Sequence, residues 1–266
     1  MFLGKIQPED INELSELQPE GWDDIRPHFS SYIISPYCEP VKITDDGKIA
    51  GVGTYIRHRT TAWLAHIIVH KDHRNKGYGL QITNALLQRL KKFRMRTIYL
   101  IATELGYPVY LKAGFELESE YVHFNGECLS REIKLSHSII PFDKKYREDI
   151  LKLDRTVSGE YRERIIKENI GTSHIFLKSD KVKGVYFPAF KDGLIIASTH
   201  EAGTELMKLR MSERDTAGFP AENITAYNFL TENGFTQIKN SKRMIYGKHR
   251  KWKPGSLYNR ISGGLG

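Results

Sequence analysis

The segment from residue 64 to residue 93 constrains the fold more than any other part of this 266-residue chain. An apolar run at 64–69 leads into a basic loop that holds Arg74, Lys76, Gly77 and Gly79. Apolar residues then recur at helical spacing up to residue 90, which predicts an amphipathic helix to about residue 93. A buried strand that enters a helix through such a loop is typical of folds in which helices pack on a sheet.

The same loop predicts an anion-binding site. The first turn of a helix presents unpaired backbone N–H groups and the positive end of the helix dipole. Glycine lets the backbone approach a ligand closely, and Arg74 and Lys76 add positive charge. The spacing fits neither the Walker loop, Gly-x-x-x-x-Gly-Lys-Ser/Thr, nor the dinucleotide fingerprint, which needs a third glycine. The alternative is an ordinary strand–helix turn that contains glycine.

Around this segment the first half predicts alternating strands and helices. Asp46-Gly47 is a turn signal typical of a β-hairpin, and Pro8 opens a helix. We expect strands at 1–6, 41–44, 49–58, 61–69, 97–102 and 115–124, and helices at 8–17, 23–37, 77–93 and 105–112. The order predicts an α+β fold, with helices packed on one mixed sheet.

The second half repeats this plan. Residues 143–153 and 159–169 are predicted helices, and 175–178 with 182–187 form a second predicted hairpin. The run from Tyr227 to Gly234-Phe235 resembles the run from Tyr107 to Gly114-Phe115. We therefore expect two tandem domains of one fold, at residues 1–135 and 136–266.

The positive charge lies in the second half. Residues 1–135 hold 17 basic and 17 acidic residues, whereas residues 136–266 hold 23 and 15, which leaves the whole net charge of +8 there. A basic surface attracts nucleic acid, a phosphate-bearing ligand or an acidic substrate, or is simply a solvated face. Between residues 239 and 253, where seven basic residues gather, only Tyr246 and Trp252 are interleaved. This pattern disfavours binding of nucleic acid by base stacking.

Composition predicts a cytoplasmic protein without membrane contact. The longest apolar runs are far shorter than the ~20 residues of a membrane-spanning helix, and the N-terminus lacks the pattern of a secretory signal. Cys38 and Cys128 are too few for a disulfide framework or a zinc site. We expect no metal site, and the oligomeric state is open.

Two motifs together resemble a known superfamily. Val69 followed by Arg74-x-x-Gly77-x-Gly79 and an amphipathic helix resembles the acetyl-CoA pyrophosphate loop of the GNAT N-acetyltransferases. Downstream, Tyr110-Leu111-Lys112-Ala113-Gly114-Phe115 resembles the Tyr-x-x-x-Gly-Phe signature of the same superfamily. The segment 102–110 and Arg243-Met244 resemble the bacterial YitH-like branch, which carries a GNAT-like domain behind a catalytic one.

The resemblance implies roles for particular residues in binding acetyl-CoA. The pantetheine arm would pair with the backbone of Ile67, Ile68 and Val69, and Tyr110 would protonate the departing thiolate. Thr103 stands where many members carry an asparagine that contacts the pantetheine, and its hydroxyl would make one such hydrogen bond. The pyrophosphate would bind the amides of the loop, which consists of Arg74, Asn75, Lys76, Gly77, Tyr78 and Gly79.

The general base is not fixed by the resemblance. Trp63 and Ala65 stand where some members place His or Glu. His66, Glu104 and a water relay remain as alternatives for the group that takes the amine proton.

The second half lacks the motifs to which the resemblance assigns cofactor binding and catalysis. It has no Arg-x-x-Gly-x-Gly loop, and Leu230 stands where the resemblance needs the tyrosine. We expect a degenerate GNAT-like domain that shapes the acceptor site, and one acetyl-CoA per chain.

The sequence thus predicts an acetyl-CoA-dependent N-acetyltransferase that acts by direct attack in a ternary complex. The acceptor would be a primary amine of a small molecule or peptide, and the basic second half favours one with a carboxylate or phosphate. The alternative is a non-catalytic acyl-CoA sensor or a nucleic-acid-binding module that uses the basic region.

Overall fold

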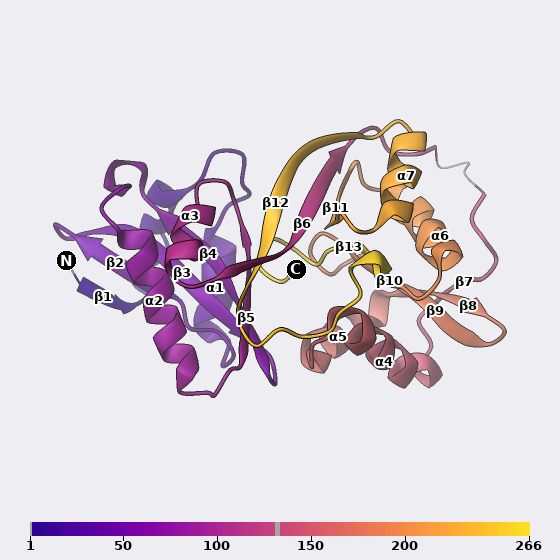
Figure 1. Ribbon diagram of the computed structural model, residues 1–266, viewed down its shortest axis with the longest axis horizontal. Helices are drawn as coiled ribbons and strands as arrows, with labels where there is room; N and C mark the ends of the chain where they lie inside the picture. The colour runs from indigo at the N-terminus through magenta and orange to yellow at the C-terminus, as the bar shows by residue number, and fades with distance from the viewer. Residues whose placement is uncertain (1, 131–133) are drawn as a thin grey trace. The chain divides into compact units, whose positions relative to one another are not determined.

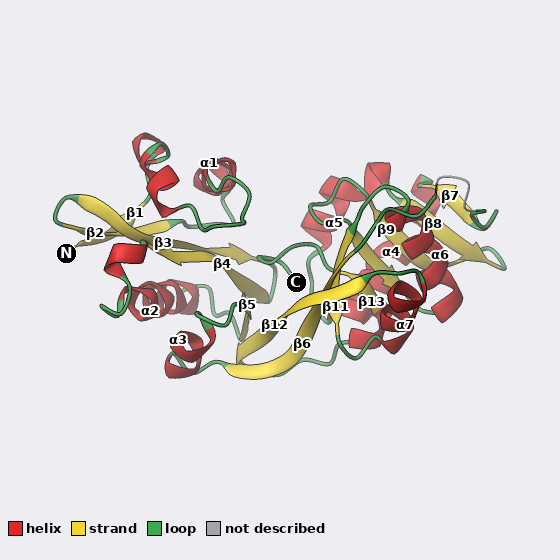
Figure 2. Ribbon diagram, turned by 90° about the horizontal axis from the view of Figure 1, so that it is seen from above, coloured by secondary structure: helices red, strands yellow, loops and turns green. Residues whose placement is uncertain are grey.

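The computed structural model describes residues 2–130 and 134–266. The first half contains β1 (Phe2–Lys5), α1 (Arg26–Ile34), β2 (Val41–Asp45), β3 (Lys48–Arg57), β4 (Thr61–Val69), α2 (Tyr78–Lys91), β5 (Thr97–Ala102), α3 (Tyr107–Lys112) and β6 (Glu116–Asn125). Strands β1 to β4 are antiparallel neighbours in order, and β5 is parallel to β4. In Figure 2, α1 lies on one face of these strands and α2 with α3 on the other. The mixed sheet with helices packed on it confirms the predicted fold class.

The hairpin between β2 and β3 forms where its turn residues predict it. Asp46 and Gly47 both have positive φ, at 49° and 79°, which a tight two-residue hairpin turn requires. The corresponding turn of the second half, Ser179-Asp180, has φ of 52° and 57°. Local turn chemistry therefore sets the register of both hairpins.

The predicted helix at 8–17 is wrong in type. The chain there forms two short 3₁₀ helices, Pro8–Asp10 and Glu13–Leu17, which bury Leu14 and Leu17. Pro8 supports a helical first turn, as predicted, but the segment is too short and too tied to the sheet to propagate an α-helix. The side chain of Glu13, for example, accepts the backbone N–H of Ile49 at 2.6 Å.

The second half repeats the element order of the first. It contains β7 (Ile139–Pro141), α4 (Arg147–Ser158), α5 (Glu163–Asn169), β8 (His174–Lys178), β9 (Lys181–Phe187), β10 (Leu194–Ala197), α6 (His200–Met211), β11 (Thr216–Pro220), α7 (Ile224–Glu232), β12 (Thr236–Gly247) and β13 (Leu257–Asn259). Helices α4 and α6 both pack on β9 and β10, and Figure 1 shows them on opposite sides of these strands. Helix α4 stands where the first half has its two short 3₁₀ helices, and among the described strands β13 follows β12 without a counterpart after β6.

The two compact units of the chain exchange strands. One unit comprises residues up to Leu117 together with Met244–His249 and Leu265, and the other comprises Glu118–Arg243 with Arg250–Gly264 and Gly266. Strand β6 therefore lies mostly in the second unit, where it pairs antiparallel with β11 from Tyr121 to Asn125. The end of β12 lies in the first unit. Within the first unit, this end of β12 is the neighbour of β5.

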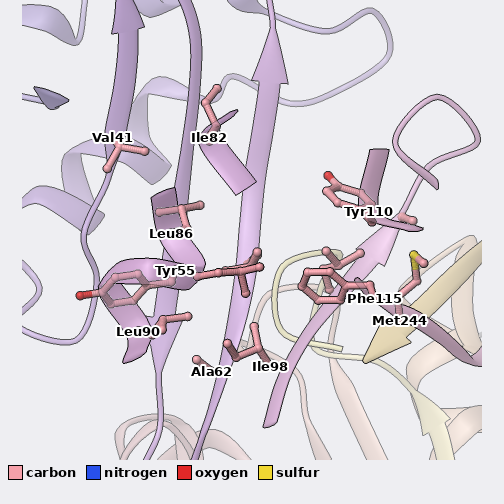
Figure 3. Packing of buried hydrophobic residues seen from close by; sticks show 14 of the residues in the cluster. Val41, Tyr55, Ala62, Ile82, Leu86, Leu90, Ile98, Tyr110, Phe115 and Met244 are labelled. Atoms are coloured by element: carbon pink, nitrogen blue, oxygen red, sulfur yellow. The ribbon is translucent and has the colours of Figure 1, made fainter. Parts of the chain in front are cut away.

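Each exchanged strand contributes to the core of the unit that receives it. Met244 of β12 is fully buried in the cluster that α2 makes with the first sheet, beside Phe115 (Figure 3). Val122 and Phe124 of β6 pack in the cluster beneath α6 and α7. Burial of these apolar side chains stabilises each unit through residues that are distant in the sequence.

Strand β6 also carries a buried histidine, which makes stability depend on pH. His123 is 7% exposed, and its Nε2 lies 2.8 Å from Ser241 Oγ. Burial, helped by the positive charges of Arg260 and Lys239, lowers the pKa of His123 to about 3. The unfolded chain takes up a proton below about pH 6.5 and the folded chain does not, so stability present above pH 6.5 is lost as pH falls towards 3.

We therefore expect His123→Gln to flatten the pH dependence of unfolding. From pH 6.5 downward, the wild-type protein should lose about 1.4 kcal/mol per pH unit through this group, or about 2 kcal/mol between pH 7 and pH 5. Urea unfolding at these two pH values measures the difference. His137→Gln, at an exposed histidine, is the control and should keep the wild-type slope. An unchanged slope in His123→Gln would contradict the linkage.

Candidate active site

Strands β4 and β5 pair at one end and separate at the other. Their parallel pairing joins Thr61–Trp63 to Thr97–Tyr99 and does not continue, although β4 runs on to Val69 and β5 to Ala102. Ile67, Ile68 and Val69, which the sequence predicts to bind pantetheine, lie on the separated part of β4. Their backbone on this side has no strand to pair with among the described residues, so an extended ligand can pair there.

A bulge in β4 lies at the start of the separated part. The register with β3 changes from Thr54 opposite Ala65 to Val52 opposite Ile68, which places one extra residue in β4. His66 lies in this bulge with a φ of 50°, a left-handed conformation that is uncommon for residues other than glycine. Bulges of this kind redirect a side chain out of the ladder, and here the redirected side chain is an imidazole.

The basic loop folds so that the first turn of α2 is open. Asn75 and Gly77 have φ of 63° and 83°, and Gly77 is the N-cap residue. No side chain caps this end of α2 in the part of the chain that the structure describes. The amides of the first helical turn are therefore available to an anion. Arg74 is exposed and makes no ion pair with any described residue.

Asp45 at the end of β2 holds this loop in place, a contact that sequence reasoning missed. Its carboxylate accepts the Tyr78 hydroxyl at 2.7 Å and lies 3.3 Å from His73 Nδ1 and 3.7 Å from Lys76 Nζ. The hydrogen bond from Tyr78, with the charge of Lys76, lowers the pKa of Asp45. Tyr78 thus buries its ring in the core and offers only its backbone to a ligand. Residues 45 and 78 are too far apart in the sequence for any local pattern to reveal this contact.

Gly79 lies between the end of β4 and α3. A Cβ atom built on it would lie 3.7 Å from Val109 and 3.8 Å from Val69, which is ordinary van der Waals contact. The fold itself therefore does not require glycine at this helical position. Without a side chain, this position leaves the backbone of α2 open to close approach.

Tyr110 lies on α3 at the edge of the same core. Its ring packs against Phe115 at a centroid distance of 6.1 Å, and it is 8% exposed. Figure 3 shows its hydroxyl turned away from Met244, and no described residue hydrogen-bonds to it. Burial raises the pKa of Tyr110 above its usual range, so the hydroxyl keeps its proton at neutral pH. The protonated hydroxyl can therefore donate a hydrogen bond to a ligand.

Thr103 and Glu104 follow β5 at its separated end. The Thr103 hydroxyl accepts the Gly106 N–H at 3.3 Å and keeps its own proton for donation to a ligand. Glu104 is exposed in the turn before α3. Of the predicted base candidates it is the one that the surrounding residues constrain least.

The neighbours of His66 constrain its side chain more than those of Glu104 do. Its Nδ1 lies 3.0 Å from the Tyr32 hydroxyl, and its ring packs at 4.8 Å from the ring of His28 and 6.1 Å from that of Trp22. Burial raises the pKa of Tyr32, so this phenol remains protonated. Trp22, which is 46% exposed, also lines a surface groove of about 260 Å³ with Ser15, Gln18, Asp24 and Arg26. An aromatic cluster thus joins β4 to a surface groove on the α1 side.

The comparisons with known proteins agree with this geometry. Over its whole length the chain is similar to the crystal structure of a putative acetyltransferase from Pyrococcus horikoshii, with a TM-score of 0.81, 18% identity and 95% of that chain covered. A GCN5-related N-acetyltransferase from Anabaena variabilis matches 92% of this chain and 72% of its own, with a TM-score of 0.59 and 14% identity. The chain has the GNAT fold.

A probable N-acyltransferase from Enterococcus faecalis has the same coverage, with a TM-score of 0.56 and 12% identity. Residues 8–115 match the model of the acetyltransferase (GNAT) family. No curated protein sequence matches the chain. Within residues 2–130 and 134–266, no helix has the length and apolar character needed to cross a membrane.

Proposed function

We propose that the chain is an acetyl-CoA-dependent N-acetyltransferase whose catalytic site lies in the first half. The observation that carries this proposal is the separation of β4 from β5 next to the open end of α2. An acyl-CoA needs both features, because its pantetheine arm has amide groups that pair with a strand and its pyrophosphate needs amide donors. The YitH-like branch, with a catalytic domain followed by a degenerate one, remains part of this proposal.

The reaction is direct transfer between two bound substrates. The acceptor nitrogen attacks the thioester carbonyl, the C–S bond breaks as the C–N bond forms, and Tyr110 gives its proton to the departing sulfur. The amine proton passes to His66. When Nδ1 of His66 donates to Tyr32, Nε2 is the basic nitrogen, and the left-handed backbone of the bulge fixes the ring. We prefer His66 to Glu104 because its neighbours fix its position.

The acceptor approaches from the side of α1. The groove beside Trp22 contains the ion pair of Arg26 with Asp24, whose Nη2 and Oδ2 atoms lie 2.8 Å apart. This pair leaves the groove near neutrality, so the preference for a carboxylate or phosphate on the acceptor rests on the charge of the second half. A panel of amino acids, aminoglycosides, polyamines and lysine peptides tests it, and a clear preference for spermidine would contradict it.

Substitution of Gly79 tests the cofactor site without disturbing the fold. We expect Gly79→Glu to weaken acetyl-CoA binding by about 100-fold, roughly 3 kcal/mol, because a carboxylate would enter the pyrophosphate site. The helix should be unharmed, since glutamate in a first turn is favourable and the position has room for a Cβ. Calorimetric titration with acetyl-CoA measures the affinity, and the thermal midpoint measures the fold.

Gln88→Glu is the matched control, because it adds the same charge at an exposed position far along α2. It should bind acetyl-CoA as the wild type does. If Gly79→Glu bound acetyl-CoA as tightly as the wild type, the proposed cofactor site would be wrong. Binding of acetyl-CoA by the wild type without turnover of any amine in the panel would favour the sensor instead.

A further inference from the structure

The second half contains the same structural opening as the first, and a strand occupies it. Strand β10, helix α6 and strand β11 stand in the element order where β4, α2 and β5 stand in the first half. Between β4 and β5 the ladder ends after Trp63. Between β10 and β11, by contrast, lies the C-terminal strand β13 (Figure 1).

Strand β13 uses hydrogen-bonding groups from both neighbours. On one side Asn259 pairs with Ile195, and Leu257 with Ile196, in an antiparallel ladder. On the other side the Arg260 N–H donates to the Gly218 carbonyl at 2.8 Å, and the Gly218 N–H donates to the Asn259 side chain at 2.9 Å. The strand therefore satisfies the backbone groups that an extended ligand would otherwise meet.

Tyr258 covers the start of α6 in the same way. A Cβ atom on Gly203 would lie only 2.0 Å from the Tyr258 ring, so the ring rests directly on the helix backbone. The Tyr258 hydroxyl reaches His200 Nδ1 at 3.4 Å. At the N-cap, Thr199 accepts the Ala202 N–H, whereas the equivalent end of α2 has no such cap. The end of α6 is thus covered by the chain itself.

Strand β13 and Ile261, which follows it closely, are buried in the core of the second half. Tyr258 and Asn259 are each 1% exposed, and Ile261 is fully buried. The Asn259 amide donates to the carbonyls of Asp192 and Gly193 at 2.9 and 2.8 Å. Displacement of the strand would leave these buried polar groups unsatisfied, which is costly.

We propose that β13 is a built-in occupant of the acyl-CoA cleft of the second half, so that this half is closed to the cofactor in every state of the folded protein. The inference rests on the proposed function of the first half, because it equates the two openings. Two independent arms test it, one on packing and one on binding.

The packing arm is a double-mutant cycle on thermal stability. Gly→Ala inside a helix ordinarily stabilises, yet Gly203→Ala should lower the thermal midpoint by about 5 °C because Tyr258 occupies the space. In the Tyr258→Ala background the same change should be neutral or stabilising. Gly171→Ala, at a glycine with no neighbour within 4 Å, is the control and should change little. A stabilising Gly203→Ala in the wild-type background would overturn the proposal.

The binding arm counts acetyl-CoA sites. The wild type should bind one acetyl-CoA per chain, and Gly79→Glu, which disables the first-half site, should show no second tight site. Tight binding of acetyl-CoA that persists in Gly79→Glu would contradict the proposal that β13 closes the cleft of the second half. If the wild type binds no acetyl-CoA, the proposed function fails, while the packing arm still reports on β13.

Discussion

Replacing Tyr110 by phenylalanine is expected to lower kcat by about 10²–10⁴-fold, the usual contribution of a general acid. The affinity for acetyl-CoA should change less than about threefold, because the hydroxyl acts mainly as negative charge develops on sulfur. The phenylalanine ring keeps the contact with Phe115, so the core is preserved. Steady-state kinetics with the best acceptor, together with acetyl-CoA titration, separate the two effects.

Tyr246→Phe is the matched control for this variant. Tyr246 packs against the same Phe115, at a centroid distance of 5.5 Å, but from the exchanged strand β12. Its kcat should stay within about twofold of the wild-type value. Full activity of Tyr110→Phe across the pH range would mean that water protonates the thiolate and that Tyr110 is a packing residue.

A chain that ends at residue 135 is expected to lose the folded state of the first unit. It would lack the segment Met244–His249, which belongs to that unit and lies beside β5. The lost contacts include the bond from Thr97 Oγ1 to the Lys248 carbonyl at 2.6 Å and the bond from Lys248 N–H to the Arg96 carbonyl at 2.7 Å. The edge of β5 would be exposed, which favours aggregation. Chemical unfolding of the fragment should show no cooperative transition.

Two point variants of β12 in the full chain test the same contribution without truncation. Met244→Ala should cost about 2–5 kcal/mol of unfolding free energy, because Met244 is fully buried between β5, Phe115 and their neighbours. Ile238→Ala, at a residue of the same strand that is 55% exposed, should stay within about 0.5 kcal/mol. A cooperatively folded 1–135 fragment, or equal effects of the two variants, would contradict the role of the exchanged strand.

The sequence by itself determined the local elements that carry the site. The apolar run, the glycines at 77 and 79 and the helical periodicity after them predict β4, the loop and α2, because each rests on torsion preferences and spacing within a few residues. Asp46-Gly47 predicts its hairpin for the same reason. At residues 8–17, where contacts with β3 compete with helix propagation, the local pattern predicts the wrong element.

The tertiary structure alone decided which strands pair and what holds or closes each opening. Asp45 fixes the loop from 33 residues away, Met244 completes a core built by the first half, and Tyr258 covers Gly203 from the end of the chain. Every strand presents the same backbone N–H and C=O groups, so a local sequence pattern does not predict which strand it will pair with. The strand pairing that forms is the one that buries the most apolar surface and leaves the fewest polar groups unsatisfied. Both quantities depend on residues that are distant in the sequence and meet only in the folded chain.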